Sequence, residues 1–263
     1  MTERVYPLTI NNLKAPLKML VHDDRDQHVS KGIAENGVWE VYETQLIIER
    51  LQPGDVFVDV GANIGYYSVL ASQLVGAAGR VHGFEPDPNN FALFKKNVLL
   101  NQLNNVDCYN VALSDSDDEG ALYLNNNNFG DHQIYDDGSG RDSCAIQLRN
   151  GANLLSSVAN IRMIKIDTQG AEFQVLSGLL PLLKKQIGPL SLIVEFWPYG
   201  LTKSGASASQ LLDLLLSLKL PLSVIDHINH DLAPSTEKQL RGWVKMMADH
   251  PDDQGFMNIL VGY

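Results

Sequence analysis

A short apolar segment that ends in a glycine-containing turn does most to constrain the fold of this chain. The run at 56–60 (VFVDV) is β-rich and too short for a helix, and Gly61 and Gly65 lie in the turn that follows it. Apolar residues then recur at helical spacing over residues 65–75. A buried strand, a tight turn and a helix in this order predict the first unit of an α/β sheet.

The same alternation of short apolar runs and amphipathic stretches continues along the chain. It favours a mostly parallel, Rossmann-like sheet of about seven strands with helices on both faces, the doubly wound α/β class. The predicted strands lie at 56–60, 80–84, 106–111, 162–166, 190–196, 222–225 and 257–261. The predicted helices lie at 65–75, 88–98, 172–178 and 206–218.

Two regions depart from this alternation. Residues 120–150 are rich in asparagine and glycine, so we expect an insertion over the carboxyl edge of the sheet, partly a strand near 143–148. Residues 1–50 are expected to form an N-terminal arm or lid. Residues 51–263 are then expected to form a single domain that carries the insertion.

Charge and cysteine content limit the classes of partner. The chain has 31 acidic and 20 basic residues, a formal charge of −11 that disfavours binding to a nucleic acid backbone. Two cysteines, Cys108 and Cys144, make neither a disulfide framework nor a multi-cysteine zinc site. The first twenty residues do not resemble a signal peptide, and no apolar run reaches membrane-spanning length. We therefore expect a cytoplasmic protein without nucleic acid or membrane partners. The sequence does not decide between a monomer and a homodimer.

The spacing of glycines after the first strand distinguishes between cofactors. Ligands of open α/β sheets bind beyond the carboxyl ends of the strands. Gly61 and Gly65 allow a ligand to approach the backbone, whereas Asn63 stands where a dinucleotide-binding loop needs glycine beside the pyrophosphate. The loop therefore favours a cofactor without a diphosphate over NAD.

Residues after the second and third predicted strands could hold a nucleoside. Glu85 lies twenty residues beyond Gly65, at the end of the second strand, where a carboxylate can accept hydrogen bonds from both ribose hydroxyls. Backbone groups of Ala112, Leu113 and Ser114 are placed to hold an adenine, although a plain loop explains that segment equally well.

Three motifs in order resemble the FkbM-type methyltransferases, a branch of the class I S-adenosylmethionine-dependent enzymes. They are VDVGANIGYY at 58–67, FEP at 84–86 and IKIDTQGAE at 164–172, and the similarity runs from Trp39 to Asn258. The resemblance implies methyl transfer from S-adenosylmethionine, often to a hydroxyl of a sugar or secondary metabolite. One departure is Thr168-Gln169, where Val-Glu is commoner.

The resemblance also implies a set of cofactor-binding residues. It assigns the methionine part to the glycine loop, the ribose to the FEP motif, and a closing role to the acid just upstream of the first strand. In this sequence the residues are Asp59, Gly61, Ala62, Asn63 and Gly65, then Glu85 and Pro86, then Glu40, with Asp167 beside them.

A hydroxyl acceptor benefits from a base that removes its proton, and three residues are candidates for the catalytic site. His132, in the insertion, is the expected base because the pKa of histidine lies near neutrality. Asp167, at the end of the fourth strand, and Glu195, near the end of the fifth, are expected to shape the acceptor pocket. Their alternative roles are a helix cap and a buried ion pair. Trp197 and Tyr199 either floor this pocket or pack in the core.

Two groups of residues contain possible metal ligands, and neither group is predicted to bind a metal. His132, Asp167 and Glu195 would need to converge from separate loops to hold a divalent ion. His227 and His230, with neighbouring acids, are better explained as a solvated loop.

The leading interpretation is an S-adenosylmethionine-dependent O-methyltransferase that acts on a small molecule such as a sugar, glycoside or secondary metabolite. An NAD(P)-dependent oxidoreductase and a cofactor-binding protein without catalysis are the alternatives. The sequence does not decide the acceptor, or between O-, N- and C-methylation.

Overall fold

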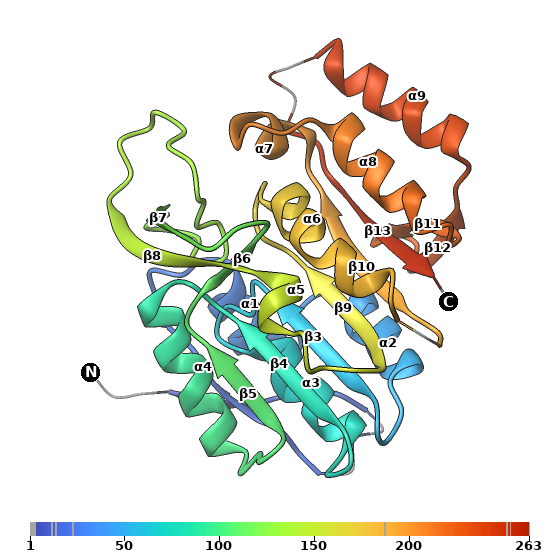
Figure 1. The fold of residues 1–263 in the computed structure, drawn as a ribbon. Helices are drawn as coiled ribbons and strands as arrows, with labels where there is room; N and C mark the ends of the chain where they lie inside the picture. The colour runs from blue at the N-terminus through green and yellow to red at the C-terminus, as the bar shows by residue number, and fades with distance from the viewer. Residues whose placement is uncertain are drawn as a thin grey trace.

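The fold is centred on one large sheet, shown in the computed structural model of Figure 1. The structure describes residues 4–11, 13, 15–22, 24–186, 188–250, 252 and 254–262. Within these residues the main sheet has eight strands, of which five are parallel. In sheet order the parallel strands are β5 (Val106–Tyr109), β4 (Arg80–Phe84), β3 (Val56–Val60), β9 (Ile161–Ile166) and β10 (Ser191–Phe196). Antiparallel pairing then adds β13 (Met257–Gly262), β11 (Leu222–Asp226) and β12 (Asp231–Pro234).

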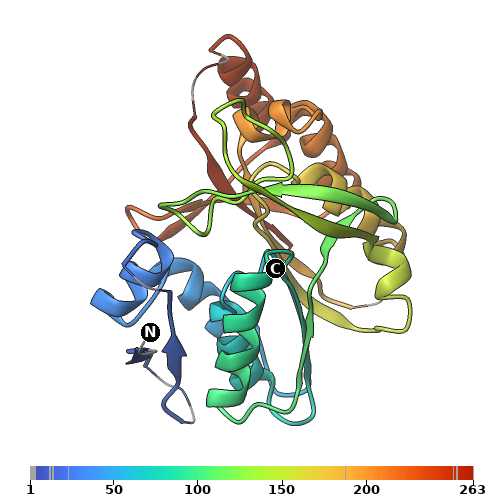
Figure 2. The same ribbon diagram turned by 90° about the vertical axis from the view of Figure 1, so that its left-hand side faces the viewer.

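Helices cover both faces of this sheet (Figures 1 and 2). One face shares an apolar core with α1 (Val29–Asn36), α2 (Val41–Arg50) and α3 (Tyr66–Val75). The other face shares a core with α6 (Glu172–Leu183), α8 (Ala208–Ser217) and α9 (Glu237–Ala248). In β3, Phe57 joins the first core and Val58 and Val60 the second, as the two-residue period of a strand requires. The predicted doubly wound α/β fold is confirmed.

The strand order reverses between β3 and β9. From β3 the chain continues outward through β4 and β5, whereas β9 and β10 lie on the other side of β3. In sheets of this kind ligands bind at such a reversal, outside the carboxyl ends of the strands. A ligand site is therefore expected at the loops that follow β3, β4, β9 and β10.

The third strand is shorter than predicted. It ends at Tyr109, and the Asn110 side chain donates hydrogen bonds to the carbonyls of Glu85 (2.9 Å) and Pro86 (3.0 Å). These bonds turn the chain away from the main sheet, so the predicted strand over 106–111 is wrong in its last two residues.

The segment after Asn110 builds a second sheet, of three strands. They are β6 (Ala112–Ser114), β8 (Ser143–Asn150) and β7 (Asp118–Tyr123), in that order. The expected strand near 143–148 is thus present, and the connection 124–142 is the irregular part of the predicted insertion. The short helix α5 (Gly151–Leu154) leads back to β9.

The N-terminal region packs against the rest of the fold. Strands β1 (Val5–Pro7) and β2 (Lys18–Leu20) pair with each other, and Asn97 of α4 (Pro88–Leu100) accepts a hydrogen bond from the Leu20 amide at 2.6 Å. Because α1 and α2 share the core of α3, the predicted boundary near residue 50 is not marked by a change of core, and it stays a prediction. In the parts of the chain that are described, no helix is both long and apolar enough to span a membrane.

Candidate active site

A cavity of about 530 Å³ lies at the carboxyl ends of β3, β4, β9 and β10. This volume is typical of small-molecule sites. The residues singled out from the sequence that line it are Glu40, Gly61, Ala62, Asn63, Glu85, Pro86, Ala112, Leu113, His132, Asp167 and Glu195, together with Trp197 and Tyr199.

Three residues expected at the cofactor lie outside the lining. Asp59 is buried in β3, where it accepts a 2.6 Å hydrogen bond from the Ser68 hydroxyl. Gly65 caps α3 with a φ of 86°, and Ser114 is buried in β6. Their direct contact with a cofactor stays a prediction.

The glycine loop brings the ends of β3 and β9 together. Gly61 has a φ of 82°, and a Cβ atom there would lie 1.9 Å from the backbone oxygen of Asp167. Only glycine permits this approach without strain. Asn63 also has a positive φ, 52°, and its backbone amide points at Glu85, the residue that follows β4.

Glu85 accepts a hydrogen bond from that amide and is held in place at the cavity wall. Its carboxylate oxygens accept hydrogen bonds from the backbone amides of Asn63 (2.7 Å) and Asp87 (2.8 Å), and the residue is 5% exposed. Burial raises the pKa of Glu85 to about 8, against which the two amides stabilise the charged form. Each oxygen retains a lone pair for a hydroxyl donor, so the arrangement suits a ribose.

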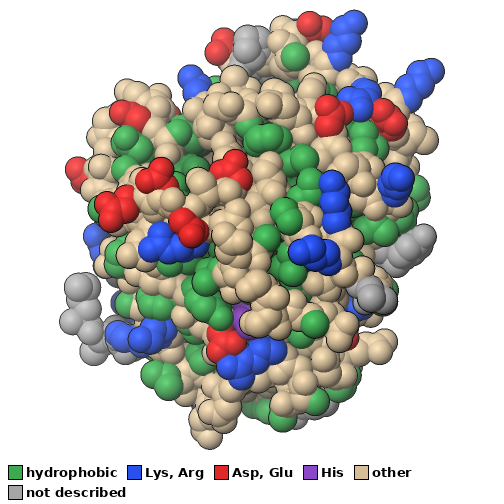
Figure 3. All heavy atoms as spheres, viewed as in Figure 1, with side chains coloured by type: hydrophobic (Ala, Val, Ile, Leu, Met, Phe, Trp, Pro, Cys, Tyr) green, Lys and Arg blue, Asp and Glu red, His purple; other side chains and the backbone are tan. Residues whose placement is uncertain are grey.

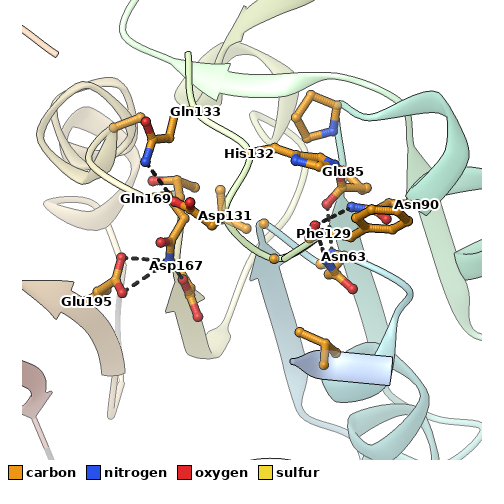
Figure 4. Close-up of a pocket in the computed structure, with 18 of the residues that line it drawn as sticks. Asn63, Glu85, Asn90, Phe129, Asp131, His132, Gln133, Asp167, Gln169 and Glu195 are labelled. Carbon is orange, nitrogen blue, oxygen red and sulfur yellow. Dashed lines mark hydrogen bonds between the residues drawn. The ribbon is translucent and has the colours of Figure 1, made fainter. Parts of the chain in front are cut away.

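Loop 124–142 is tied down over this half of the cavity through one carbonyl group. The side-chain amides of Asn63 and Asn90 both donate to the backbone oxygen of Phe129, at 2.9 and 3.0 Å (Figure 4). On the other side, the Phe129 amide donates to Asp26 at 3.3 Å, and its ring packs edge-on against His22. The insertion, the glycine loop and the N-terminal arm therefore meet at Phe129.

The opposite half of the cavity holds two carboxylates joined by an amide (Figure 4). The Gln169 side-chain nitrogen donates to Asp167 at 2.8 Å and to both oxygens of Glu195 at 3.1 and 3.0 Å. A glutamate at position 169 would lack this donor and place a third carboxyl group beside the other two. Burial, followed by the charges of Asp167 and Glu172, raises the pKa of Glu195 well above its usual value.

A buried lysine compensates the acids on this side. Lys165 of β9 is 3% exposed, donates to Asp167 at 2.6 Å, and lies 3.8 Å from Glu40 and 3.7 Å from Glu43. Its ammonium group also lies over the Tyr67 ring, 4.8 Å from the centroid. Burial alone would raise the pKa of Asp167, but the Lys165 charge and hydrogen bond outweigh it and hold that pKa below its usual value.

His132 lies apart from the two carboxylates with which it was grouped. Figure 4 shows it beside Glu85, on the other side of the cavity from Glu195. Its Nδ1 accepts a 3.0 Å hydrogen bond from the Asn125 backbone amide, so the neutral ring carries its proton on Nε2. Burial lowers the pKa of His132. The role of base stays a prediction for His132.

The second histidine cluster forms a hairpin turn between β11 and β12. Asp226 accepts hydrogen bonds from the amides of Ile228 and Asn229, and His230 stacks on the Tyr42 ring. Across all residues that the structure describes, no three His, Cys, Asp or Glu side chains are arranged to hold a metal ion.

Several site residues did not emerge from the sequence. Lys165 had a readable signal, because it is a charged residue inside an apolar strand, the same signal that singled out Glu195. Asn90, Phe129 and Arg141 had none, since their place at the cavity depends on the path of loop 124–142.

Comparison with known proteins identifies the family. The methyltransferase FkbM domain model matches residues 59–219, more than half of the chain. The 31-O-demethyl-FK506 methyltransferase FkbM of Streptomyces tacrolimicus is 35% identical over 79 residues, which are 29% of this chain and 30% of that protein. The hexuronic acid methyltransferase AglP of Haloferax volcanii is 27% identical over 146 residues, 53% of this chain and 56% of that protein.

The matched segments thus span about a third to just over half of these relatives. Among solved structures, a protein assigned as an rRNA methylase from Clostridium thermocellum superposes with a TM-score of 0.50 at 12% identity, over 84% of this chain and 92% of the other. At that identity the likeness concerns the fold alone, which is that of the class I methyltransferases. The family model covers the glycine loop, the three strand-end acids Glu85, Asp167 and Glu195, and the insertion, so the chain belongs to the FkbM methyltransferase family.

Proposed function

We propose that the protein transfers the methyl group of S-adenosylmethionine to a hydroxyl oxygen of a small molecule. The observation that carries this proposal is the division of one cavity into two halves. Glu85 and the glycine loop form a nucleoside half, and Asp167, Gln169 and Glu195 form an acidic half across from it. A donor and an acceptor bound in these halves would meet over the ends of β3 and β9.

The residues present fit this cofactor. Among the described lining residues, six are acidic (Glu40, Glu85, Asp131, Asp137, Asp167 and Glu195) and two are lysine or arginine (Lys165 and Arg141). An excess of carboxylates favours a cationic ligand. When bound, the sulfonium of the cofactor supplies an activated methyl group, and the electron pair of the broken C–S bond stays on sulfur.

Asp167 is the proposed base. The acceptor oxygen forms the new bond to carbon and loses its proton, and a carboxylate within hydrogen-bond reach can take up that proton. Lys165 keeps Asp167 ionised at neutral pH, and Gln169 and Lys165 fix the orientation of its two oxygens. Holding donor and acceptor in line supplies the remaining rate enhancement.

The alternatives fit the cavity less well. Asn63 fills the position where a dinucleotide needs glycine, and its side chain is bound to Phe129. A nucleic acid acceptor would meet an acidic cavity, and on the face of Figure 3 lysine and arginine side chains are interspersed with acidic ones rather than gathered in one patch.

The test separates binding from chemistry. S-Adenosylhomocysteine, but not NAD(H), should raise the melting temperature, by the equivalent of about 2.7 kcal/mol at 100 times its Kd. With labelled S-adenosylmethionine and a panel of hydroxylated acceptors, Asp167→Asn should lower turnover by about 10²–10⁴ while still binding S-adenosylhomocysteine. The exposed Asp249→Asn is the matched control. Stabilisation by NAD(H) alone would refute the proposal, and binding without turnover would support the non-catalytic alternative.

A further inference from the structure

The charges around the acidic half of the cavity bear on which acceptors it admits. We call its inner surface the acceptor wall, formed by Asp167, Gln169, Glu195, Trp197 and Tyr199. The first three residues offer hydrogen-bonding groups joined in one network. Trp197 and Tyr199 are partly exposed to the cavity with their rings 5.6 Å apart, which is a surface for the apolar face of a ring-shaped ligand.

The one lysine and the one arginine of the described cavity lining are already bound to acids. Lys165 donates to Asp167 and lies within 4 Å of Glu40 and Glu43. Arg141 pairs with Asp131 at 3.0 Å and with Asp137 at 3.1 Å. An anionic acceptor would have to take one of these cations from its carboxylates, which is costly in a partly buried site.

Lys203 and Glu195 also affect how a negatively charged acceptor would interact with the acceptor wall. Lys203 contacts the Tyr199 ring from outside the cavity lining, and its side chain is exposed, so water and salt screen its charge. On the wall itself, the raised pKa of Glu195 follows from burial and from the charges of Asp167 and Glu172. The wall therefore opposes even the charge of its own carboxyl group.

We propose that the acceptor is an uncharged polyhydroxylated ring, such as a neutral sugar unit, and that the acceptor wall rejects anionic counterparts such as uronates. This inference rests on the proposed methyl transfer and adds the charge class of the substrate. Carboxylate and amide groups accept and donate hydrogen bonds to ring hydroxyls, whereas they offer an anionic substituent no unshared positive charge. An uncharged acceptor would distinguish this chain from AglP, its relative named as a hexuronic acid methyltransferase.

Binding of two matched probes tests the inference. Methyl β-glucoside and methyl β-glucuronide differ only at C6, and each is titrated into protein saturated with S-adenosylhomocysteine, with ligand-observed NMR as the readout. The glucoside should bind at least about tenfold more tightly, the factor given by about 1.4 kcal/mol of charge repulsion. Equal or tighter binding of the glucuronide overturns the inference, and so does binding of neither probe. Failure to bind S-adenosylhomocysteine instead overturns the proposed function.

A charge-changing pair of variants sharpens the test. Gln169→Lys places a cation between the two carboxylates and should shift the glucoside-to-glucuronide affinity ratio about tenfold toward the glucuronide. Gln102→Lys is the matched control, because Gln102 is exposed, lies outside the cavity lining, and has a φ of 54° against 53° for Gln169. Since the ratio is measured within each variant, a loss of folded protein does not change it. An unchanged ratio in Gln169→Lys that still binds S-adenosylhomocysteine contradicts the inference.

Discussion

Replacement of Lys165 by methionine is the perturbation from which the charge arrangement predicts the largest effect. The ammonium group is buried, bonded to Asp167 and close to Glu40 and Glu43. Methionine keeps much of the length and apolar volume of the stem but leaves the three acids without their cation. Removing one partner of a buried ion pair typically costs about 3–5 kcal/mol. We expect Lys165→Met to lose that amount at pH 8, a large share of a total stability of about 5–15 kcal/mol.

The pH dependence distinguishes a lost charge from lost packing. Without Lys165, burial acts unopposed on Asp167, and the pKa of this carboxyl rises in the folded state above its unfolded value of about 4. The folded variant then binds more protons than the unfolded chain, so its unfolding free energy rises as the pH falls from 8 toward 5. Each additional bound proton returns about 1.4 kcal/mol per pH unit. In the wild type the depressed pKa of Asp167 contributes stability that is complete above about pH 4 and constant over this range.

Guanidinium denaturation at pH 8 and pH 6 measures both quantities. The difference between wild type and Lys165→Met should shrink by about 2.7 kcal/mol over these two units if one proton is taken up. Lys184→Met, at an exposed lysine, should stay within about 0.5 kcal/mol of the wild type at both pH values. A loss below about 1 kcal/mol, or an equal loss at both pH values, would refute the reasoning, because a packing defect does not titrate.

Three other perturbations test the two halves of the cavity. Because burial raises the pKa of Glu85 to about 8 and hydroxyl donors favour its ionised form, affinity for S-adenosylhomocysteine should rise between pH 6 and 9 in calorimetry, and Glu85→Gln should abolish that slope. Asn90→Ala removes one of the two donors to the Phe129 carbonyl and should speed dissociation of S-adenosylhomocysteine about five- to tenfold in stopped flow, whereas an unchanged rate would mean that the loop does not gate release. Gly61→Ala drives a Cβ atom against the Asp167 carbonyl at positive φ and should cost more than about 3 kcal/mol in denaturant unfolding; a near-neutral result would contradict the close approach of the two strand ends.

The parts of the site that could be predicted from the sequence are those fixed by strand ends. Glu85 follows β4, Asp167 follows β9, and Glu195 is the next-to-last residue of the adjacent strand β10. Parallel strands present their carboxyl ends at one edge, so the pairing of Asp167 with Glu195 across one residue follows from topology. The Gln169 that joins them was visible only as a departure from the commoner motif.

His132 was harder to place because it belongs to a connection without periodic structure. Its position depends on contacts distant in sequence, above all those of the Phe129 carbonyl and amide with Asn63 and Asp26. Proximity of an insertion to a cavity does not specify which half a given side chain enters. The base assigned from intrinsic pKa therefore fell in the nucleoside half.

Elements at the C-terminal edge show a different kind of omission. Helix α9 is absent from the predicted elements, although Thr236 and Gln239 form a capping box that is visible in the sequence. Leu240, Val244 and Met247 follow it at helical spacing and are buried. Strand β12 is an edge strand of four largely exposed residues, so it lacks the apolar run by which the other strands were recognised.

One physical feature, the excess of acids around a single buried lysine, links cofactor, base and acceptor. A carboxylate-rich cavity attracts a donor that carries a positive charge, and this attraction weakens once the methyl group has left and the sulfur is neutral. Nearby negative charges raise the pKa of a buried carboxyl and favour its protonated form, which cannot act as a base, unless a cation is placed against it. Lys165 is bonded to Asp167 and not to Glu195, so its charge lowers the pKa of Asp167, whereas burial raises the pKa of Glu195. In the proposed mechanism this cation therefore keeps Asp167, rather than Glu195, available to take up the proton of an acceptor hydroxyl.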